Sequence, residues 1–482
     1  MGYYKIKEKK MNKNNFFIPS EIYIKGGKSI EGEITTSGAK NAILGLMCAA
    51  LLTDEKVILH NVPYITDVLE MGHIMKDLGV DIRLDTENKV LFIHARKIKQ
   101  NVLSASAAKF RASYYLWGSL LARFKRSGEF DELKVCLPGG CSFGKKRPTD
   151  FHEKLMKNIF GAKISEEYRD DSNYLNIKLP KKNTEIDPVY ATAKVSHGAT
   201  FHWLLSIAGA DDMKMMYNSS LEPEVSNLID MLRQMGLDIR GSERTGLVYS
   251  GTNKKLLKGG EFQVIPDRME AATYALLTLG TRGRIRIKGI VYEHCKPWLD
   301  LLNSVAGKGI YFSPDKTDII LDLADKPDFS GEIIQMSPFP GMETDLQQIW
   351  TPILGMAKSE STIVDIIWPG RSAHLVEMKK LGLISECRQI EIDAGQGVAY
   401  QALIAKIKPS KFHAGKVSGM DLRGTTGLII LAAMTKGQST IENPEYSLRG
   451  YPNLIQNLKS LGVDIKVSKA GKEIEPLPYY KG

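Results

Sequence analysis

The chain has 482 residues, of which 43% are hydrophobic and 25% are charged, so a globular protein with more than one domain is expected. Its net charge of +10 suits nucleic acid, a membrane surface or a small anionic substrate, because a positive field attracts each of them. The longest uncharged apolar run, residues 42–52, is too short to cross a membrane, and no basic cluster interleaved with aromatics follows the N-terminal segment, which argues against membrane and nucleic-acid partners.

The N-terminus has neither a secretory signal nor a myristoylation signal, so a cytoplasmic protein is expected. The five cysteines are scattered without a C-x-x-C pair, which indicates neither a disulfide framework nor a zinc site. No metal is predicted.

In chain order, one pattern occurs six times: an amphipathic helix that ends at a glycine, followed by a strand of aliphatic residues. A helix commonly ends with a glycine in the left-handed conformation, and β-branched residues then favour a strand. The glycines recur with a period of about 75 residues, and they are Gly79, Gly161, Gly236, Gly307, Gly382 and Gly462. Upstream of each lies a second helix of small residues, a polar turn and an alternating strand. Six such repeats predict two domains of three, with a crossover near residue 265.

Short polar islands interrupt this scaffold at residues 37–41, 138–144, 343–345 and 421–424. Lys40 and Asn41 begin a predicted helix, where backbone N–H groups and the helix dipole favour a phosphate. Cys141 lies in a glycine-flanked loop before Lys145, Lys146 and Arg147, and nearby cations lower a thiol's pKa. It is the one cysteine with a case for reactivity.

Four arginines lie in or beside turns rich in Gly, Ser or Thr: Arg111, Arg371, Arg423 and Arg449. A planar guanidinium can bind a carboxylate or phosphate through two hydrogen bonds. These residues are candidates for binding an anionic substrate.

Ten motifs occur in a fixed order: GEITTSGAKNA (32–42), LHNVP (59–63), FRAS (110–113), LPGGCSFG with RPTDFH (137–144 and 147–152), KVSHGAT (194–200), EPEV (222–225), IPDRMEA (265–271), TDLQ (344–347), DLRGT (421–425) and RGY (449–451). Through them the chain from about Tyr23 to Val467 resembles the UDP-N-acetylglucosamine 1-carboxyvinyltransferase family, an enolpyruvyl transferase branch related to the shikimate-pathway synthase. The resemblance implies transfer of the enolpyruvyl group of phosphoenolpyruvate to a hydroxyl of UDP-N-acetylglucosamine in peptidoglycan biosynthesis, with release of phosphate.

The implied fold is α/β: two similar domains, each of three βαβαββ-type repeats, with helices inside and sheets outside. One domain spans residues 41–265, with the Cys141 loop and the uridine contacts. The other combines residues 1–40 and 266–482, so the N-terminal strand belongs with the C-terminal half. The active site is expected in the cleft between the domains. No cofactor is implied, since phosphoenolpyruvate is a co-substrate, and a monomer or weak homo-oligomer is expected.

The resemblance also implies roles for single residues. The cations for the phosphate of phosphoenolpyruvate would be Lys40, Arg147 and Arg449, and those for its carboxylate Arg371 and Arg423, with Arg111 nearby. Asp345 matches the general base, and Cys141 matches the general acid, with Lys40 and Arg423 also catalytic. Alkylation of Cys141 by the family's epoxide inhibitor fosfomycin would test its reactivity. The matches to nucleotide-sugar contacts are Asn41, Arg147, Pro148, Asp150, Lys194, Ser196, His197, Gly198, Thr344 and Asp345.

The sequence departs from the family pattern mainly near the acceptor. His197 replaces an aliphatic residue, Met342-Glu343 replaces Phe-Pro, and Gly370 replaces Asn. There is one extra residue after Cys141 and a longer insertion between Arg371 and Asp421. An acceptor such as UMP or another uridine nucleotide, as in nucleoside-antibiotic pathways, is therefore an alternative.

Two further alternatives come from other functional classes. One is an RNA 3′-phosphate cyclase-like enzyme, for which a histidine beyond His413 is missing. The other is a non-catalytic nucleotide-binding protein.

Overall fold

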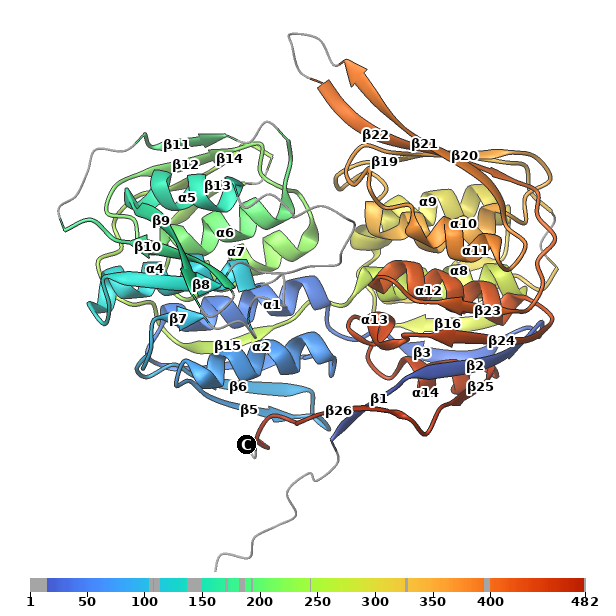
Figure 1. Ribbon diagram of the computed structural model, residues 1–482, viewed down its shortest axis with the longest axis horizontal. Coiled ribbons are helices and arrows are strands. Elements are labelled where there is room, and N and C mark those ends of the chain that lie inside the picture. The colour runs from blue at the N-terminus through green and yellow to red at the C-terminus, as the bar shows by residue number, and fades with distance from the viewer. Residues whose placement is uncertain are drawn as a thin grey trace, which may run out of the picture.

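Six four-stranded sheets and one two-stranded sheet form the framework of the described part of the chain. The structure is a computed structural model, and it describes residues 15–103, 107, 113–136, 150–169, 172–181, 187–191, 194–242, 244–325, 328–393 and 399–480. Figure 1 shows two lobes of similar construction, each with helices inside and strands around the outside. The fold class predicted from the sequence is confirmed by this arrangement and by the comparisons given below.

The first lobe contains three sheets with one pattern, in which the first two strands are parallel and the others antiparallel. Their strands, in spatial order, are β15 (Gly260–Gln263), β4 (Lys56–His60), β6 (Val90–His94) and β5 (Asp81–Asp85); then β7 (Val102–Leu103), β8 (Glu132–Cys136), β10 (Ser172–Lys178) and β9 (Lys163–Arg169); then β11 (Val189–Ala191), β12 (Lys214–Tyr217), β14 (Gly246–Tyr249) and β13 (Ile239–Ser242).

The second lobe repeats this pattern three more times. Its strands are β3 (Glu31–Thr35), β16 (Arg284–Lys288), β18 (Asp318–Asp322) and β17 (Ile310–Phe312); then β19 (Ile333–Met336), β20 (Ser361–Asp365), β22 (Ala399–Lys408) and β21 (Ile384–Asp393); then β23 (Lys416–Ser418), β24 (Gly437–Glu442), β2 (Glu21–Gly26) and β25 (Asp464–Val467). The N-terminal strands β2 and β3 thus pair with strands of the C-terminal part of the chain.

The described helices lie mainly between these sheets. Those of the first lobe are α1 (Lys40–Ala49), α2 (Thr66–Asp77), α4 (Ser113–Ser127), α5 (Asp150–Phe160), α6 (His197–Ile207) and α7 (Pro223–Gln234), with the short η1 (Ala50–Leu52). Those of the second are α8 (Arg268–Thr281), α9 (Tyr292–Ala306), α10 (Gln347–Leu354), α11 (Ala373–Lys379), α12 (Leu422–Met434), α13 (Glu445–Leu448) and α14 (Leu454–Ser460), with η2 (Thr344–Leu346). All six repeat glycines have positive φ, between 65° and 97°, just after a helix, which confirms the predicted helix stops.

The buried apolar residues form two separate cores. One runs from Ala39 to Val264 and includes Leu477, and the other combines residues 18–34 with residues 269–465. The exact domain boundaries, 41–265 against 1–40 with 266–482, stay a prediction. Among the helices of the described residues, none combines the length and the apolar character that crossing a membrane requires.

Within the described parts of the chain, three segments connect the lobes. The segment before α1 and the segment before α8 run side by side, since Gly38 and Pro266 form an antiparallel bridge. The third segment is the C-terminal tail, which leaves β26 (Gly471–Ile474), the partner of β1 (Phe16–Pro19), and returns to the first lobe. There the backbone N–H of Leu84 donates to the carbonyl of Pro478 at 2.8 Å. Figure 1 shows this tail on the side of the molecule opposite the β21–β22 hairpin.

Candidate active site

The start of α1 lies at the junction of the two lobes. The backbone N–H of Lys40, the first residue of α1, donates to Oδ2 of Asp267 at 3.3 Å. Asp267 is also the N-cap of α8, because its Oδ1 accepts from the backbone N–H groups of Met269 and Glu270. One carboxylate from the second lobe therefore fixes the first turns of two helices, one in each lobe.

Asp67, near the start of α2, joins two of the predicted phosphate-binding cations. Its Oδ2 lies 2.8 Å from Nζ of Lys40, and its Oδ1 accepts from Nε of Arg449 at 2.8 Å. The Asp67 side chain is 1% exposed. Burial alone would raise the pKa of Asp67, but the charges of Lys40 and Arg449 outweigh it and lower that pKa. Asp67 is therefore an anion that links the first lobe to the second.

Asp345 joins the two arginines predicted to bind a carboxylate. Its Oδ1 accepts from Nη1 of Arg371 at 2.9 Å, and its Oδ2 accepts from Nε of Arg423 at 3.2 Å. Burial would raise the pKa of Asp345, but the two guanidinium groups hold it well below its usual range. Asp345 is ionised in this arrangement and a weak base.

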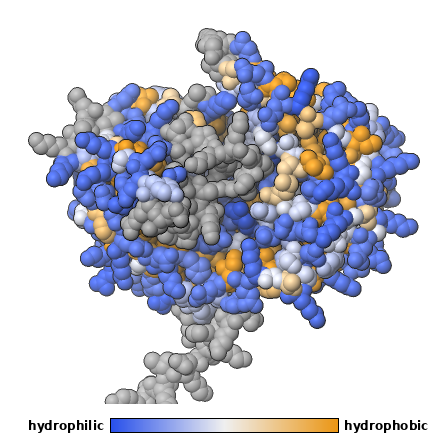
Figure 2. Space-filling view, viewed as in Figure 1, coloured by the Kyte–Doolittle hydropathy of each residue, from blue (hydrophilic) through white to orange (hydrophobic). Residues whose placement is uncertain are grey.

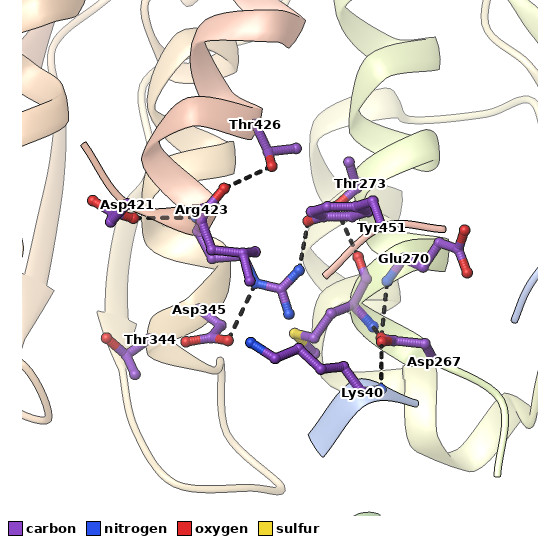
Figure 3. A network of polar contacts seen from close by, with 12 residues as sticks. Lys40, Asp267, Glu270, Thr273, Thr344, Asp345, Asp421, Arg423, Thr426 and Tyr451 are labelled. Carbon is purple, nitrogen blue, oxygen red and sulfur yellow. Dashed lines mark hydrogen bonds and ion pairs between the residues drawn. The ribbon is translucent and has the colours of Figure 1, made fainter. Parts of the chain in front are cut away.

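Both arginines are also held by other groups. The backbone carbonyl of Thr344 accepts from Nη1 of Arg371 at 2.8 Å. Nη1 of Arg423 donates to the hydroxyl of Tyr451 at 2.6 Å, and that hydroxyl also lies 2.8 Å from Oγ1 of Thr273 (Figure 3). Arg423 itself lies in the first turn of α12, which Asp421 caps through the N–H of Arg423 and Gly424.

Figure 3 shows Lys40, Asp345 and Arg423 pointing toward one another from three different elements. The structure thus brings together five of the sequence-predicted residues, namely Lys40, Asp345, Arg371, Arg423 and Arg449. Such a set of cations can bind a small substrate with several negative charges. Among the described residues, no group of three or more His, Cys, Asp or Glu is arranged to hold a metal ion.

The predicted diphosphate contacts lie at the N-terminus of α6. Ser196 is its N-cap, with Oγ accepting from the N–H of Ala199 at 3.3 Å. A Cβ added at Gly198 would meet nothing within 4 Å, so the backbone here is open to a ligand. The His197 ring lies against the Phe201 ring at a tilt of 37°, and its Nδ1 lies 3.7 Å from a carboxylate oxygen of Glu222. An open helix N-terminus suits a phosphate group.

The remaining predicted acceptor contacts are more dispersed. Asn41 is half-buried next to Lys40. Thr344 donates from Oγ1 to Oδ2 of Asp365 at 2.6 Å. Lys194 is exposed, and its Nζ lies 4.4 Å from the centre of the Tyr400 ring, on the hairpin β21–β22 of the second lobe.

Several predicted residues lie outside the described residues: Arg111, Cys141, Arg147 and Pro148. Asp150 begins α5, and its side chain lies outside as well. Their roles stay predictions.

A buried ion-pair network between the lobes was not predicted from the sequence. Nε and Nη2 of Arg268 donate to the two carboxylate oxygens of Glu224, each at 3.2 Å, and Arg268 also pairs with Glu343. Glu224 belongs to the first lobe and Glu343 to the second, so Arg268 links the lobes. Burial would raise the pKa of Glu224, but Arg268 outweighs it and lowers that pKa.

Some of the residues that were not predicted stand in motifs that carry the family resemblance. Asp267 and Arg268 belong to IPDRMEA, Glu224 to EPEV and Tyr451 to RGY. A buried polar group requires a partner, so charged residues at the start of an apolar helix indicate a buried ion pair or hydrogen bond. Asp67 offers no such signal, because an acidic residue in the first turn of a helix is common for its effect on the helix dipole alone.

Comparisons with known proteins agree with this geometry. The family model for EPSP synthase (3-phosphoshikimate 1-carboxyvinyltransferase) matches residues 24–471. UDP-N-acetylglucosamine 1-carboxyvinyltransferase 2 of Streptococcus mutans is 34% identical over 449 residues, which cover 93% of this chain and 99% of the relative. UDP-N-acetylglucosamine 1-carboxyvinyltransferase of Streptococcus pneumoniae serotype 2 is 34% identical over 451 residues, 93% of this chain and 99% of the relative.

Solved structures show the same fold. The enolpyruvyl transferase NikO from Streptomyces tendae superposes with a TM-score of 0.77 at 21% identity, covering 94% of this chain and 100% of the other. EPSP synthase from Acinetobacter baumannii superposes with a TM-score of 0.64 at 16% identity, covering 93% of this chain and 100% of the other. The six-sheet fold with a cationic site between two lobes therefore defines an enzyme of the carboxyvinyl (enolpyruvyl) transferase class. Within that class, the chain belongs to the EPSP synthase family, in the branch of the UDP-N-acetylglucosamine 1-carboxyvinyltransferases.

Proposed function

We propose that this enzyme transfers the enolpyruvyl group of phosphoenolpyruvate to a hydroxyl of UDP-N-acetylglucosamine and releases phosphate. The observation that carries the proposal is the set of four cations at the lobe junction, which two carboxylates hold in pairs: Lys40 with Arg449, and Arg371 with Arg423. Phosphoenolpyruvate has a phosphate and a carboxylate attached to the same carbon, so two adjacent cation pairs match its two anionic groups. The names of the relatives support UDP-N-acetylglucosamine as the acceptor.

In this proposal, Lys40 and Arg449 would bind the phosphate, and Arg371 and Arg423 the carboxylate. The open N-terminus of α6 would bind the diphosphate of the acceptor. Lys194 would lie beside the nucleotide, and Asn41 and Thr344 beside the sugar.

The proposed reaction is an addition followed by an elimination. The acceptor oxygen forms a bond to C2 of phosphoenolpyruvate while its proton passes to Asp345. The π bond between C2 and C3 breaks, and its electron pair takes a proton from the Cys141 thiol at C3. The resulting tetrahedral ketal then loses a proton from C3 back to the thiolate, and its bond to phosphate breaks. Phosphate leaves with the proton that Asp345 accepted, so both side chains are restored.

The test is phosphate release from phosphoenolpyruvate with a panel of acceptors, namely UDP-N-acetylglucosamine, other UDP-sugars and UMP. The product is then identified by mass, since an enolpyruvyl ether is heavier than its acceptor by the transferred group. Phosphate release without any acceptor-dependent product would contradict the proposal.

A second candidate acceptor, UMP or another uridine nucleotide, is favoured by one observation. The departures His197 and Glu343 are both part of polar networks, with Glu222 and with Arg268 respectively. Polar groups in place of apolar ones change which acceptors a site binds, because a buried polar group without a partner is costly. The acceptor panel decides between the two candidates. A cytoplasmic location, the absence of a cofactor and a monomer or weak homo-oligomer stay predictions.

A further inference from the structure

Asp345 makes the contacts that a substrate carboxylate would make. Its two oxygens are divided between Nη1 of Arg371 and Nε of Arg423, at 2.9 and 3.2 Å. A donor carboxylate has the same shape, the same charge and the same number of acceptor oxygens. Both carboxylates therefore require the same two guanidinium groups.

We propose that Asp345 and the carboxylate of the donor compete for Arg371 and Arg423, so that binding of the donor releases Asp345 to act as the base. The inference rests on the proposed function, because it assigns the two arginines to the donor carboxylate. It adds that the base is held inactive until the donor has taken its place.

The surroundings allow this exchange. The Asp345 side chain is 30% exposed, whereas that of Asp67, the other carboxylate between two cations, is 1% exposed. Asp345 thus has room to move, and Asp67 does not. Arg423 stays in place when Asp345 leaves, because Tyr451 holds its Nη1, and Arg371 keeps its bond to the Thr344 carbonyl.

Release of Asp345 would also make it a stronger base. The pKa of Asp345 is lowered because Arg371 and Arg423 outweigh the effect of burial. A donor carboxylate that neutralises these guanidinium groups removes the cause of the lowering, so the pKa rises toward or above its usual value. Proton transfer from the acceptor hydroxyl then becomes easier at the step that requires it.

The test compares Asp345→Asn with Asp67→Asn in equilibrium binding of three probes: phosphoenolpyruvate, pyruvate and inorganic phosphate. Pyruvate has the carboxylate without the phosphate, and inorganic phosphate has the reverse. In Asp345→Asn we expect phosphoenolpyruvate and pyruvate to bind about tenfold tighter, because the variant no longer has the carboxylate that competes for the two arginines. The affinity for inorganic phosphate should change much less. In Asp67→Asn, pyruvate binding should stay within about threefold of wild type. Asp345→Ala replaces Asp345→Asn if the latter does not fold.

Equal tightening of all three probes in both variants would overturn the proposal, because it would reflect only the loss of negative charge. Unchanged or weaker pyruvate binding in Asp345→Asn would overturn it as well. If phosphoenolpyruvate binds neither protein but pyruvate still binds tighter to Asp345→Asn, the competition stands and the proposed donor is wrong. If wild type binds phosphoenolpyruvate and the variant binds it no tighter, the competition fails and the proposed function stands.

Discussion

Asp67 holds two cations that approach it from different lobes, and both distances are 2.8 Å. In Asp67→Asn, Lys40 and Arg449 lose the charge that positions them, although the side chain keeps its size. We expect kcat/KM for phosphoenolpyruvate to fall about 10- to 100-fold, since truncating a buried charge pair costs a few kcal/mol. Steady-state kinetics measures this, with Asp77→Asn as the control on the exposed end of the same helix. Equal kinetics for both variants would contradict a positioning role.

Glu270 gives a pH-dependent prediction for stability. Burial raises the pKa of Glu270 from 4.5 to about 7, against the opposing hydrogen bonds from Ser37. A raised pKa means that the protonated carboxyl stabilises the fold fully below pH 4.5, and that this contribution is lost as the pH rises through about 7. Relative to wild type, Glu270→Gln should therefore gain on the order of 2 kcal/mol in free energy of unfolding between pH 5 and pH 8.

Denaturant unfolding at the two pH values measures this gain, with the exposed Glu261→Gln as the control. Parallel pH dependences of wild type and Glu270→Gln would show that Glu270 titrates normally.

The cations of the site could be predicted from the sequence, but their partners could not. Arg423 and Arg449 stand in turns and motifs that are visible locally. Asp67 lies 382 residues from Arg449, and Asp345 lies 78 residues from Arg423. Pairing over such separations is decided by the packing of whole repeats, which no local pattern contains.

At the scale of single elements, the repeat glycines provide a matched pair. Gly382 and Gly462 end equivalent helices with φ of 96° and 89°. A Cβ at Gly382 would lie 2.3 Å from the carbonyl oxygen of Lys411, whereas one at Gly462 would meet nothing within 4 Å. Gly462→Ala should cost about 1 kcal/mol of stability from backbone strain, and Gly382→Ala should cost at least about 1 kcal/mol more. Unfolding free energies of the two variants measure the difference, and equal costs would contradict the contact at Gly382.

The hairpin of β21 and β22 lies in the segment where the sequence has an insertion relative to the family pattern. Tyr400, at its outer end, lies against Lys194 of the first lobe. If Lys194 binds the nucleotide, Tyr400→Ala should raise the KM for the acceptor about two- to fivefold, the energy of an exposed cation–π contact, without changing the KM for phosphoenolpyruvate. Tyr400→Phe keeps the ring and should behave as wild type. A change in the KM for phosphoenolpyruvate alone would contradict this role.

Element order was more predictable than this hairpin. Helix, glycine and strand follow from local conformational preferences, and all six predicted stops are found. The insertion shows only that residues are added between Arg371 and Asp421. The insertion forms a hairpin of ten residue pairs, which run from Ile384 opposite Lys408 to Asp393 opposite Ala399. This strand pairing cannot be predicted from the length of the insertion.

For the whole molecule, the C-terminal tail is the feature that the sequence did not predict. Leu477 is buried in the core of the first lobe against Gly72, although the preceding strand β25 belongs to a sheet of the second lobe. Its segment, Glu-Pro-Leu-Pro-Tyr-Tyr, has no periodic pattern that would indicate a packing face. On the face shown in Figure 2 the described residues are mostly hydrophilic, with smaller groups of hydrophobic residues between them.

Leu477→Ala should lower the free energy of unfolding by about 2–3 kcal/mol, because it removes buried methyl groups and leaves a cavity. The exposed Tyr479→Ala is the control and should change it by less than about 0.5 kcal/mol. Thermal unfolding followed by calorimetry measures both. Equal effects would mean that the tail does not anchor the first lobe.

The position of the tail also limits how the lobes can move. The paired segments at Gly38 and Pro266 form one attachment, and the tail forms another. Two separated backbone attachments favour rotation of one lobe about the line that joins them over other relative motions. Figure 1 shows the β21–β22 hairpin on the side of the molecule opposite the tail, so a rotation about that line would separate the lobes most on the side of the hairpin.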